Sequence, residues 1–140
     1  MIVMLDCGIR VGELVNLRVE NIDLRSGYIN TPAEIAKSRT FRQMPISSKT
    51  IKLLKEIVSI VKDTDTNYLF LSAYGNKLDT NQVIHSFSKY RKGAKIKVKC
   101  TPHVFRHTFA VNFIKDNGDV FTLQRILGHS TLEMTRRFNL

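Results

Sequence analysis

Two histidines and an arginine stand within five positions of one another in the segment TPHVFRHTFA, residues 101–110. On a helix, where each residue turns the chain by about 100°, His103, Arg106 and His107 share one side. Phe105 and the phenylalanines that follow it at four-residue steps lie on another side. The pattern predicts a helix that packs through its phenylalanines and presents its cations together. A capped amphipathic helix with a polar face toward solvent would show the same pattern.

A metal site is the less favoured use of these histidines. His103 and His107 have the i, i+4 spacing of a zinc-binding helix, but no glutamate follows the first histidine as the zinc-protease motif requires. Asp63 and Asp65 are the closely spaced acidic pair, and they lie in the polar segment KDTDTN, which is typical of a solvated turn. We therefore expect no metal ion and no other cofactor.

Three further cations occupy positions where a chain changes direction. Arg10 follows Gly8, Lys37 lies in an expected hairpin turn, and His129 follows Gly128. Each has an ordinary explanation alone: a surface charge, a solvated lysine and a structural cap. Together with the 101–110 helix they form a set suited to phosphate chemistry. Arginine binds two phosphate oxygens at once, fixed cations stabilise developing charge, and lysine or histidine can transfer a proton to a leaving alkoxide.

The elements that must position these residues are mostly helices. A helix from the first residue should end near Gly8, and a short helix is expected at 10–17. Ser26-Gly27 predicts a turn before a strand at 28–30. The segment 33–46 predicts two strands joined by a turn near Lys37 and closed by Pro45. Further helices are expected to start at Ser48, Thr80, Thr101-Pro102, Asp119 and the capping box Ser130–Glu133. The helix that starts at Asp119 should end at Gly128.

Apolar spacing identifies the buried faces of two of these helices. Residues Ile51, Leu54, Val58 and Val61 recur at helical spacing, and the next helix should turn Val83, Phe87 and Tyr90 inward. The sum is a single α+β domain, mostly helical, with a small antiparallel sheet.

The charge balance indicates a polyanionic partner. The 140 residues contain 22 Lys+Arg against 12 Asp+Glu, a net charge of +10. In KGAKIKVKC, residues 92–100, Lys95, Lys97 and Lys99 alternate with apolar residues, which predicts a basic extended stretch. A solvated basic surface is the alternative. Two cysteines outside any CxxC motif favour a reduced, intracellular protein. No apolar run approaches the roughly 18 residues that a membrane span needs.

The chain resembles the catalytic domain of tyrosine recombinases, the phage integrase family, over nearly all of residues 1–140. CGIRVGELVNL is similar to the family's first box, AKSRTFRQMPI to its β-hairpin, TPHVFRHTFA to its HxxR box, and LGHS to the box of its second histidine. The positions that match are Arg10, Glu13, Lys37, His103, Arg106 and His129. The apolar start MIVML, which has no helix cap, predicts a fragment that lacks the family's upstream DNA-clamping domain.

The resemblance implies transesterification on double-stranded DNA without a cofactor, as in the integration and recombination of mobile genetic elements. A tyrosine attacks a phosphate, forms a 3′-phosphotyrosyl link and frees a 5′-hydroxyl. Arg10 and Arg106 would clamp the phosphate, Lys37 would be the general acid, and Glu13 would support Arg10. His103 and His129 would orient the phosphate and assist proton transfer. Residues expected on DNA are Arg39, Arg42, Lys95, Lys97, Lys99 and His107.

Position 138 departs from the family pattern. The nucleophilic tyrosine lies nine residues after the second histidine, and counting from His129 reaches Phe138. The other tyrosines, Tyr28, Tyr68, Tyr74 and Tyr90, do not match that position. We expect a tyrosine-to-phenylalanine replacement, either engineered or natural, that leaves the chain unable to cleave DNA. Packing of Phe138 with Met134, four residues earlier, is the alternative explanation.

The resemblance also implies partners and a compartment. The intact protein would act in the cytoplasm at the nucleoid, with other recombinase subunits in a tetrameric synapse and no membrane. Two other interpretations remain open: a DNA-binding regulator that never cuts, which Phe138 favours, and a type IB topoisomerase, which shares the chemistry. A hydrolase that uses His103 and His129 away from DNA is a more distant alternative.

Overall fold

Most of the chain is helical, and a small sheet lies against one end of the helical part. The computed structural model describes residues 1–137, apart from the side chains of residues 132 and 133. Its helices are α1 (Ile2–Cys7), α2 (Val11–Leu14), α3 (Ser48–Val61), α4 (Thr80–Gly93), α5 (Pro102–Lys115), α6 (Val120–Leu127) and α7 (Leu132–Arg136), with a 3₁₀ turn η1 (Val19–Asn21). The strands are β1 (Ile22–Asp23), β2 (Tyr28–Thr31) and β3 (Arg42–Pro45). The expected α+β class is confirmed.

The sheet is antiparallel with strand order β1-β2-β3. Tyr28 pairs with Pro45 and Thr31 with Arg42, so the partner of β3 is β2. The strand expected at 33–36 is therefore wrong. Pro32 has no N–H to continue the ladder, and its carbonyl accepts the N–H groups of residues 35 and 36 at 3.2 and 3.1 Å. The chain turns back there, and residues 32–41 form a long connection.

Helix ends follow local capping chemistry. Gly8 and Gly128 end α1 and α6 in the left-handed conformation, with φ of 67° and 66°, which glycine adopts at little cost. Thr101 caps α5, and its side chain accepts the N–H of Val104. Three other caps differ from expectation by one residue. The side chains that accept the first free N–H groups belong to Ser47, Asp79 and Thr131.

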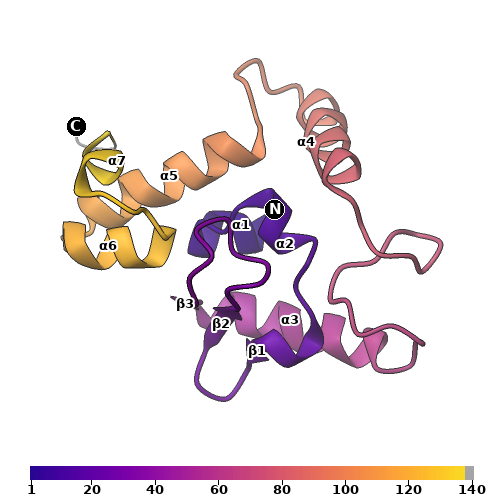
Figure 1. Cartoon of the computed structure of the whole chain (residues 1–140). Coiled ribbons are helices and arrows are strands. Elements are labelled where there is room, and N and C mark those ends of the chain that lie inside the picture. The colour runs from indigo at the N-terminus through magenta and orange to yellow at the C-terminus, as the bar shows by residue number, and fades with distance from the viewer. Residues whose placement is uncertain (138–140) are drawn as a thin grey trace.

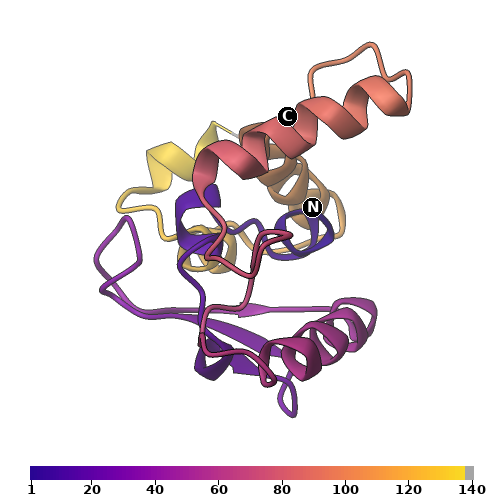
Figure 2. The same ribbon diagram turned by 90° about the vertical axis from the view of Figure 1, so that its right-hand side faces the viewer.

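One apolar cluster joins the first two helices, the sheet, α3 and α4. Its buried members include Met4, Leu17, Ile29, Met44, Leu54, Leu69 and Phe87. Phe105 of α5 packs edge-on against the Phe87 ring, with 4.7 Å between centroids. The expected burial of Tyr90 is wrong, because 58% of its side chain is exposed. Tyr90 lies in the last turn of α4, in the part that projects beyond the rest of the molecule (Figures 1 and 2).

The fold packs helices from the C-terminal part of the chain against the first helix and the sheet. Helix α1 packs on α5, and α6 packs on both α7 and β3. Figure 1 shows α5, α6 and α7 on one side of α1, with the sheet and α3 below them. Residues near position 10, the β2–β3 connection and the end of α6 therefore meet. Of the helices in residues 1–137, none is long and apolar enough to cross a membrane.

Candidate active site

The end of α6 sets the direction in which His129 leaves the helix. Gly128 is left-handed, and the N–H of His129 donates to the carbonyl of Gln124 at 3.1 Å. This six-residue closure is the Schellman motif, which ends a helix and fixes the residue after the glycine. A side chain at position 128 would also meet Arg42 Cδ at 2.7 Å. Glycine is thus needed for both the turn and the close approach of Arg42.

Three arginines converge on the last carbonyls of α6. Arg10 Nη1 donates to Leu127 O at 3.2 Å, and Arg106 Nη2 donates to the same oxygen at 2.6 Å. Arg42 Nε donates to Ile126 O at 2.9 Å. The last carbonyls of a helix have no partner within it and carry the negative end of its dipole. The C-terminus of α6 therefore attracts and orients the three guanidinium groups, which come from α2, β3 and α5.

Arg106 is buried within this group. It is 7% exposed, and its Nη1 donates to the carbonyl of Gly8. Burial and the neighbouring charges of Arg10 and Arg42 lower the pKa of Arg106 to about 9. Arg106 therefore still carries its charge at neutral pH. Arg106 joins α5 to the ends of α1 and α6 as a buried residue, so the expected grouping with His103 and His107, which are exposed, is not seen.

Glu13 supplies the counter-charge, and its main partner is Arg42. Its two carboxylate oxygens accept from Arg42 Nη1 at 2.8 Å and Nη2 at 2.7 Å. The backbone N–H of Lys37 donates to Oε1 at 3.2 Å, while Arg10 Nη1 lies 3.5 Å from the same oxygen. Burial alone would raise the pKa of Glu13, but the hydrogen bonds and charge of Arg42 outweigh burial and lower it. Glu13 is therefore ionised and ties the loop of Lys37 to the arginines.

Arg42 differs most from its expected role. We expected a DNA contact, but the residue is 4% exposed and its guanidinium binds Glu13 and Ile126. A side chain already enclosed in this way is not presented to a DNA phosphate. A sequence signal for this burial exists: Arg42 and Met44 alternate along β3 with the exposed Gln43, and alternating residues share one face of a strand.

The imidazole of His129 contacts two elements. Its Nε2 lies 3.4 Å from Arg106 Nη2, and its Nδ1 lies 2.9 Å from Thr135 Oγ1 of α7. Burial lowers the pKa of His129 to about 4, and the positive charges of Arg106, Arg10 and Arg42 add to the effect. His129 is therefore neutral at physiological pH. Sequence reasoning missed Thr135, which belongs to none of the four segments that resemble the family.

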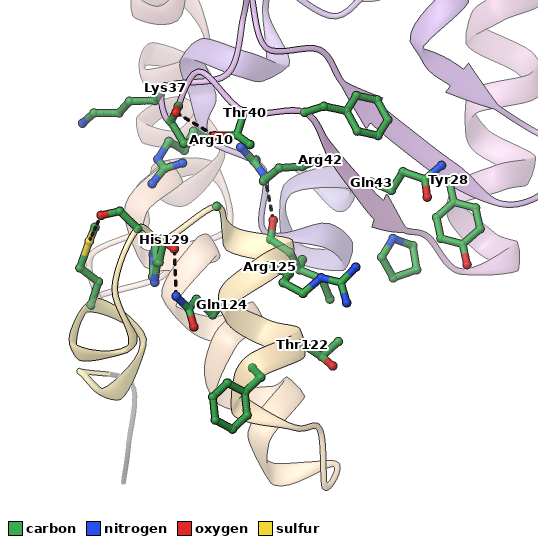
Figure 3. A pocket seen from close by; sticks show the side chains of 18 residues that line it. Arg10, Tyr28, Lys37, Thr40, Arg42, Gln43, Thr122, Gln124, Arg125 and His129 are labelled. Atoms are coloured by element: carbon green, nitrogen blue, oxygen red, sulfur yellow. Dashed lines mark hydrogen bonds between the residues drawn. The ribbon is translucent and has the colours of Figure 1, made fainter.

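Arg10, Arg42 and His129 border a cleft of about 1010 Å³ between the β2–β3 connection and α6. Arg10, Lys37 and His129 lie around one part of it, as Figure 3 shows, and Gln124 and Arg125 line it from α6. The side chain of Lys37 is exposed, while its backbone is held by Glu13. The cleft thus has a cationic wall with a solvent-accessible lysine above it.

Other expected site residues lie outside this cleft. His103 is exposed in the first turn of α5 and does not line it, and His107 is also exposed. Arg39 is exposed in the loop of Lys37, with φ of 53°. Phe138 lies outside the described residues. In residues 1–137, no group of three or more histidine, cysteine, aspartate or glutamate side chains could hold a metal ion.

The expected basic stretch forms a separate surface. Residues 94–99 follow α4 without forming a strand, and all are exposed. Lys97 and Lys99, with Arg91, line a smaller hollow of about 300 Å³ that also borders Ile84 and Ser88 of α4. We call residues 91–99 the basic segment. None of its residues lines the cleft.

Comparison with known proteins gives a consistent result. The model of the Phage integrase family matches residues 1–139. The chain is similar to the tyrosine recombinase XerC of Thermodesulfovibrio yellowstonii, with 31% identity over 137 residues that cover 92% of this chain and 44% of the relative. Among solved structures, it is similar to the crystal structure of XerA recombinase, with a TM-score of 0.90 and 33% identity over 99% of this chain and 51% of that one.

A second solved structure shares the fold at lower identity. The XerH site-specific recombinase, bound to difH substrate in a pre-cleavage complex, gives a TM-score of 0.83 and 22% identity over 99% of this chain and 41% of that one. The chain therefore spans about half the length, or less, of these relatives.

Proposed function

Because the chain belongs to the phage integrase family, we propose that it is the catalytic domain of a recombinase that breaks and rejoins double-stranded DNA through a 3′-phosphotyrosyl intermediate. We further propose that this form does not cleave, because Phe138 occupies the position of the nucleophile. The domain would work within a longer protein, with an upstream DNA-clamping domain and with other subunits in a synapse.

The observation that carries this proposal is the meeting of Arg10, Lys37, Arg106 and His129 at the end of α6. Two of the three guanidinium groups, those of Arg42 and Arg10, contact the carboxylate of Glu13, so the three arginines together keep an excess of positive charge. A scissile phosphate in the cleft would compensate that excess. Cations already held in place cost no reorganisation when charge develops on the phosphate during the reaction.

Each residue then has a distinct part. Arg10, whose side chain is 21% exposed, binds a phosphate oxygen directly. Arg106 supports it from beneath through their shared acceptor, Leu127 O. The flexible, exposed Lys37 reaches the leaving 5′-oxygen and protonates it as the general acid. Neutral His129 lines the same cleft and orients the phosphate. His103, which lies away from the cleft, would take part only if bound DNA extended to the start of α5.

A larger DNA footprint has support from the basic segment. Lys95, Lys97 and Lys99 are exposed, and the net charge of +10 favours a polyanion. We propose that these lysines contact phosphates beside the cleavage point, together with Arg39 of the loop and His107 of α5. The Tn1549 transposon integrase, solved in complex with transposon right end DNA, supports DNA as the partner class.

Restoring the nucleophile tests the proposal. Phe138→Tyr in the full-length gene product should give a denaturant-resistant protein–DNA adduct on a suicide substrate, whereas the Phe138 form gives none. Phenylalanine lacks the attacking oxygen, so its chemistry is absent rather than weakened. The matched control is Arg10→Ala in the Phe138→Tyr protein, which should lose most of the adduct.

Two results would refute the assignment. An adduct formed by the Phe138 protein would place the nucleophile elsewhere. A Phe138→Tyr protein that binds DNA tightly and forms no adduct would favour the alternative function, a regulator that binds recombination sites without cutting them. Phe138 itself is the observation that favours this second function.

A further inference from the structure

The hydroxyl of Thr135 faces the ring of His129 in a protected position. Thr135 is 2% exposed, and its Oγ1 lies 2.9 Å from Nδ1 of His129. Since water barely reaches this hydroxyl, it competes little for the hydrogen bond. Thr135 belongs to α7 and His129 to the turn after α6, so this contact joins two elements that meet at the cleft.

The other side of the ring decides which nitrogen carries the proton. Nε2 of His129 lies 3.4 Å from Nη2 of Arg106. A guanidinium can only donate, and a neutral imidazole has one donor and one acceptor nitrogen. Nε2 is therefore placed to accept, which favours the proton on Nδ1. The hydroxyl of Thr135, which can accept, is the group in front of that proton.

We propose that Thr135 is a positioning residue that holds His129 as the neutral Nδ1–H tautomer, with the lone pair of Nε2 directed toward Arg106. Free imidazole side chains in water favour the opposite tautomer, with the proton on Nε2, so the hydroxyl has a specific effect. The lowered pKa of His129 agrees with a neutral ring, since Arg106 from α5, Arg10 from the start of α2 and Arg42 from β3 all oppose a positive charge there.

This contact connects the cleft to the last helix. Thr135 precedes position 138 by three residues in the sequence. If α7 moved away, His129 would lose the acceptor for its Nδ1–H, and its ring would be free to rotate and change tautomer. Nε2 would then steady Arg106 as its hydrogen-bond acceptor, and through Arg106 the phosphate site, only while α7 is in place. This consequence rests on the proposed function, whereas the tautomer itself does not.

Nitrogen NMR of the 140-residue chain measures the tautomer directly. In long-range proton–nitrogen spectra of uniformly ¹⁵N-labelled protein at neutral pH, His129 should show a pyrrole-type shift at Nδ1 and a pyridine-type shift at Nε2. His129→Gln assigns the signals by removing them. His85 and His103, whose side chains are exposed, report solvent-exposed rings in the same spectra.

Two substitutions separate the hydroxyl from the shape of the side chain. Thr135→Ser keeps the hydroxyl and should keep the Nδ1–H pattern. Thr135→Val keeps the shape, removes the acceptor, and should shift His129 toward the Nε2–H tautomer or an average of both. Amide spectra of each variant establish that it is folded.

The proposal is overturned if the parent protein shows His129 charged or protonated on Nε2 at neutral pH, a result that needs no variant to fold. It is also overturned if a folded Thr135→Val protein keeps the parent pattern. DNA binding and adduct formation are measured separately. Their failure with the Nδ1–H pattern intact would count against the proposed function alone.

Discussion

Replacing Glu13 by glutamine should destabilise the protein by about 3–5 kcal/mol, the usual cost of breaking a buried ion pair. Glu13 and Arg42 are 2% and 4% exposed, and their atoms meet at 2.8 and 2.7 Å. Solvent therefore screens the pair very little. Glutamine keeps the size of the side chain but leaves Arg42 and its two arginine neighbours without their carboxylate. Because the free energy of unfolding of small domains is about 5–15 kcal/mol, Glu13→Gln would remove a large part of the stability.

A double-mutant cycle assigns the loss to the pair. Arg42→Met leaves Glu13 buried without its main partner, and it should cost a similar amount. The double variant removes both charges, so its cost should fall below the sum of the single costs by about 1–3 kcal/mol. Urea unfolding at neutral pH, followed by circular dichroism, measures all four proteins. The matched control is Glu34→Gln, which removes an exposed carboxylate in the β2–β3 connection. Its stability should stay within about 0.5 kcal/mol of the parent.

The pH dependence provides a second readout. The pKa of Glu13 is lower in the folded protein than its ordinary 4.5, so its ionisation stabilises the fold fully above pH 4.5. That contribution is lost as the pH falls through the folded pKa. The gap in stability between the parent and Glu13→Gln should therefore narrow in acid. Additive costs in the cycle, or a Glu13→Gln cost below about 1 kcal/mol, would refute the reasoning.

Three further outcomes are expected. In the Phe138→Tyr background, Arg106→Lys keeps the charge but loses the fork of donors, so single-turnover cleavage should fall at least about 10-fold, or 1.4 kcal/mol; undiminished cleavage would contradict the role of Arg106. Because the pKa of His129 is lowered from 6.5 to about 4, its contribution to stability is full above pH 6.5 and declines as the pH falls toward 4. A comparison with His129→Gln across that range by urea unfolding should show this loss, and a constant difference would count against it. Lys97→Gln with Lys99→Gln should reduce the slope of log affinity against log salt by about 0.9 for each DNA phosphate that the variant no longer neutralises, and an unchanged slope in fluorescence anisotropy would place DNA elsewhere.

Local chemistry in the sequence determined the ends of several helices. Gly8 and Gly128 end helices wherever the rest of the chain lies, because the left-handed turn costs glycine little. The threonine and proline at 101–102 start α5 for a similar local reason. These predictions depend on residues within a few positions of one another, and the structure confirms them.

Tertiary structure alone decided which charged side chains are paired inside the protein and which remain at the cleft. Arg42 and Glu13 are 29 positions apart, and Thr135 meets His129 only because α7 packs on α6. The spacing that groups His103 with Arg106 also gave no sign that His103 would lie outside the cleft. Such partners depend on how β3, α2 and α5 gather at the end of α6. Burial makes an unpaired charge costly, so the fold pairs Arg42 internally and leaves Arg10 and Lys37 at the cleft.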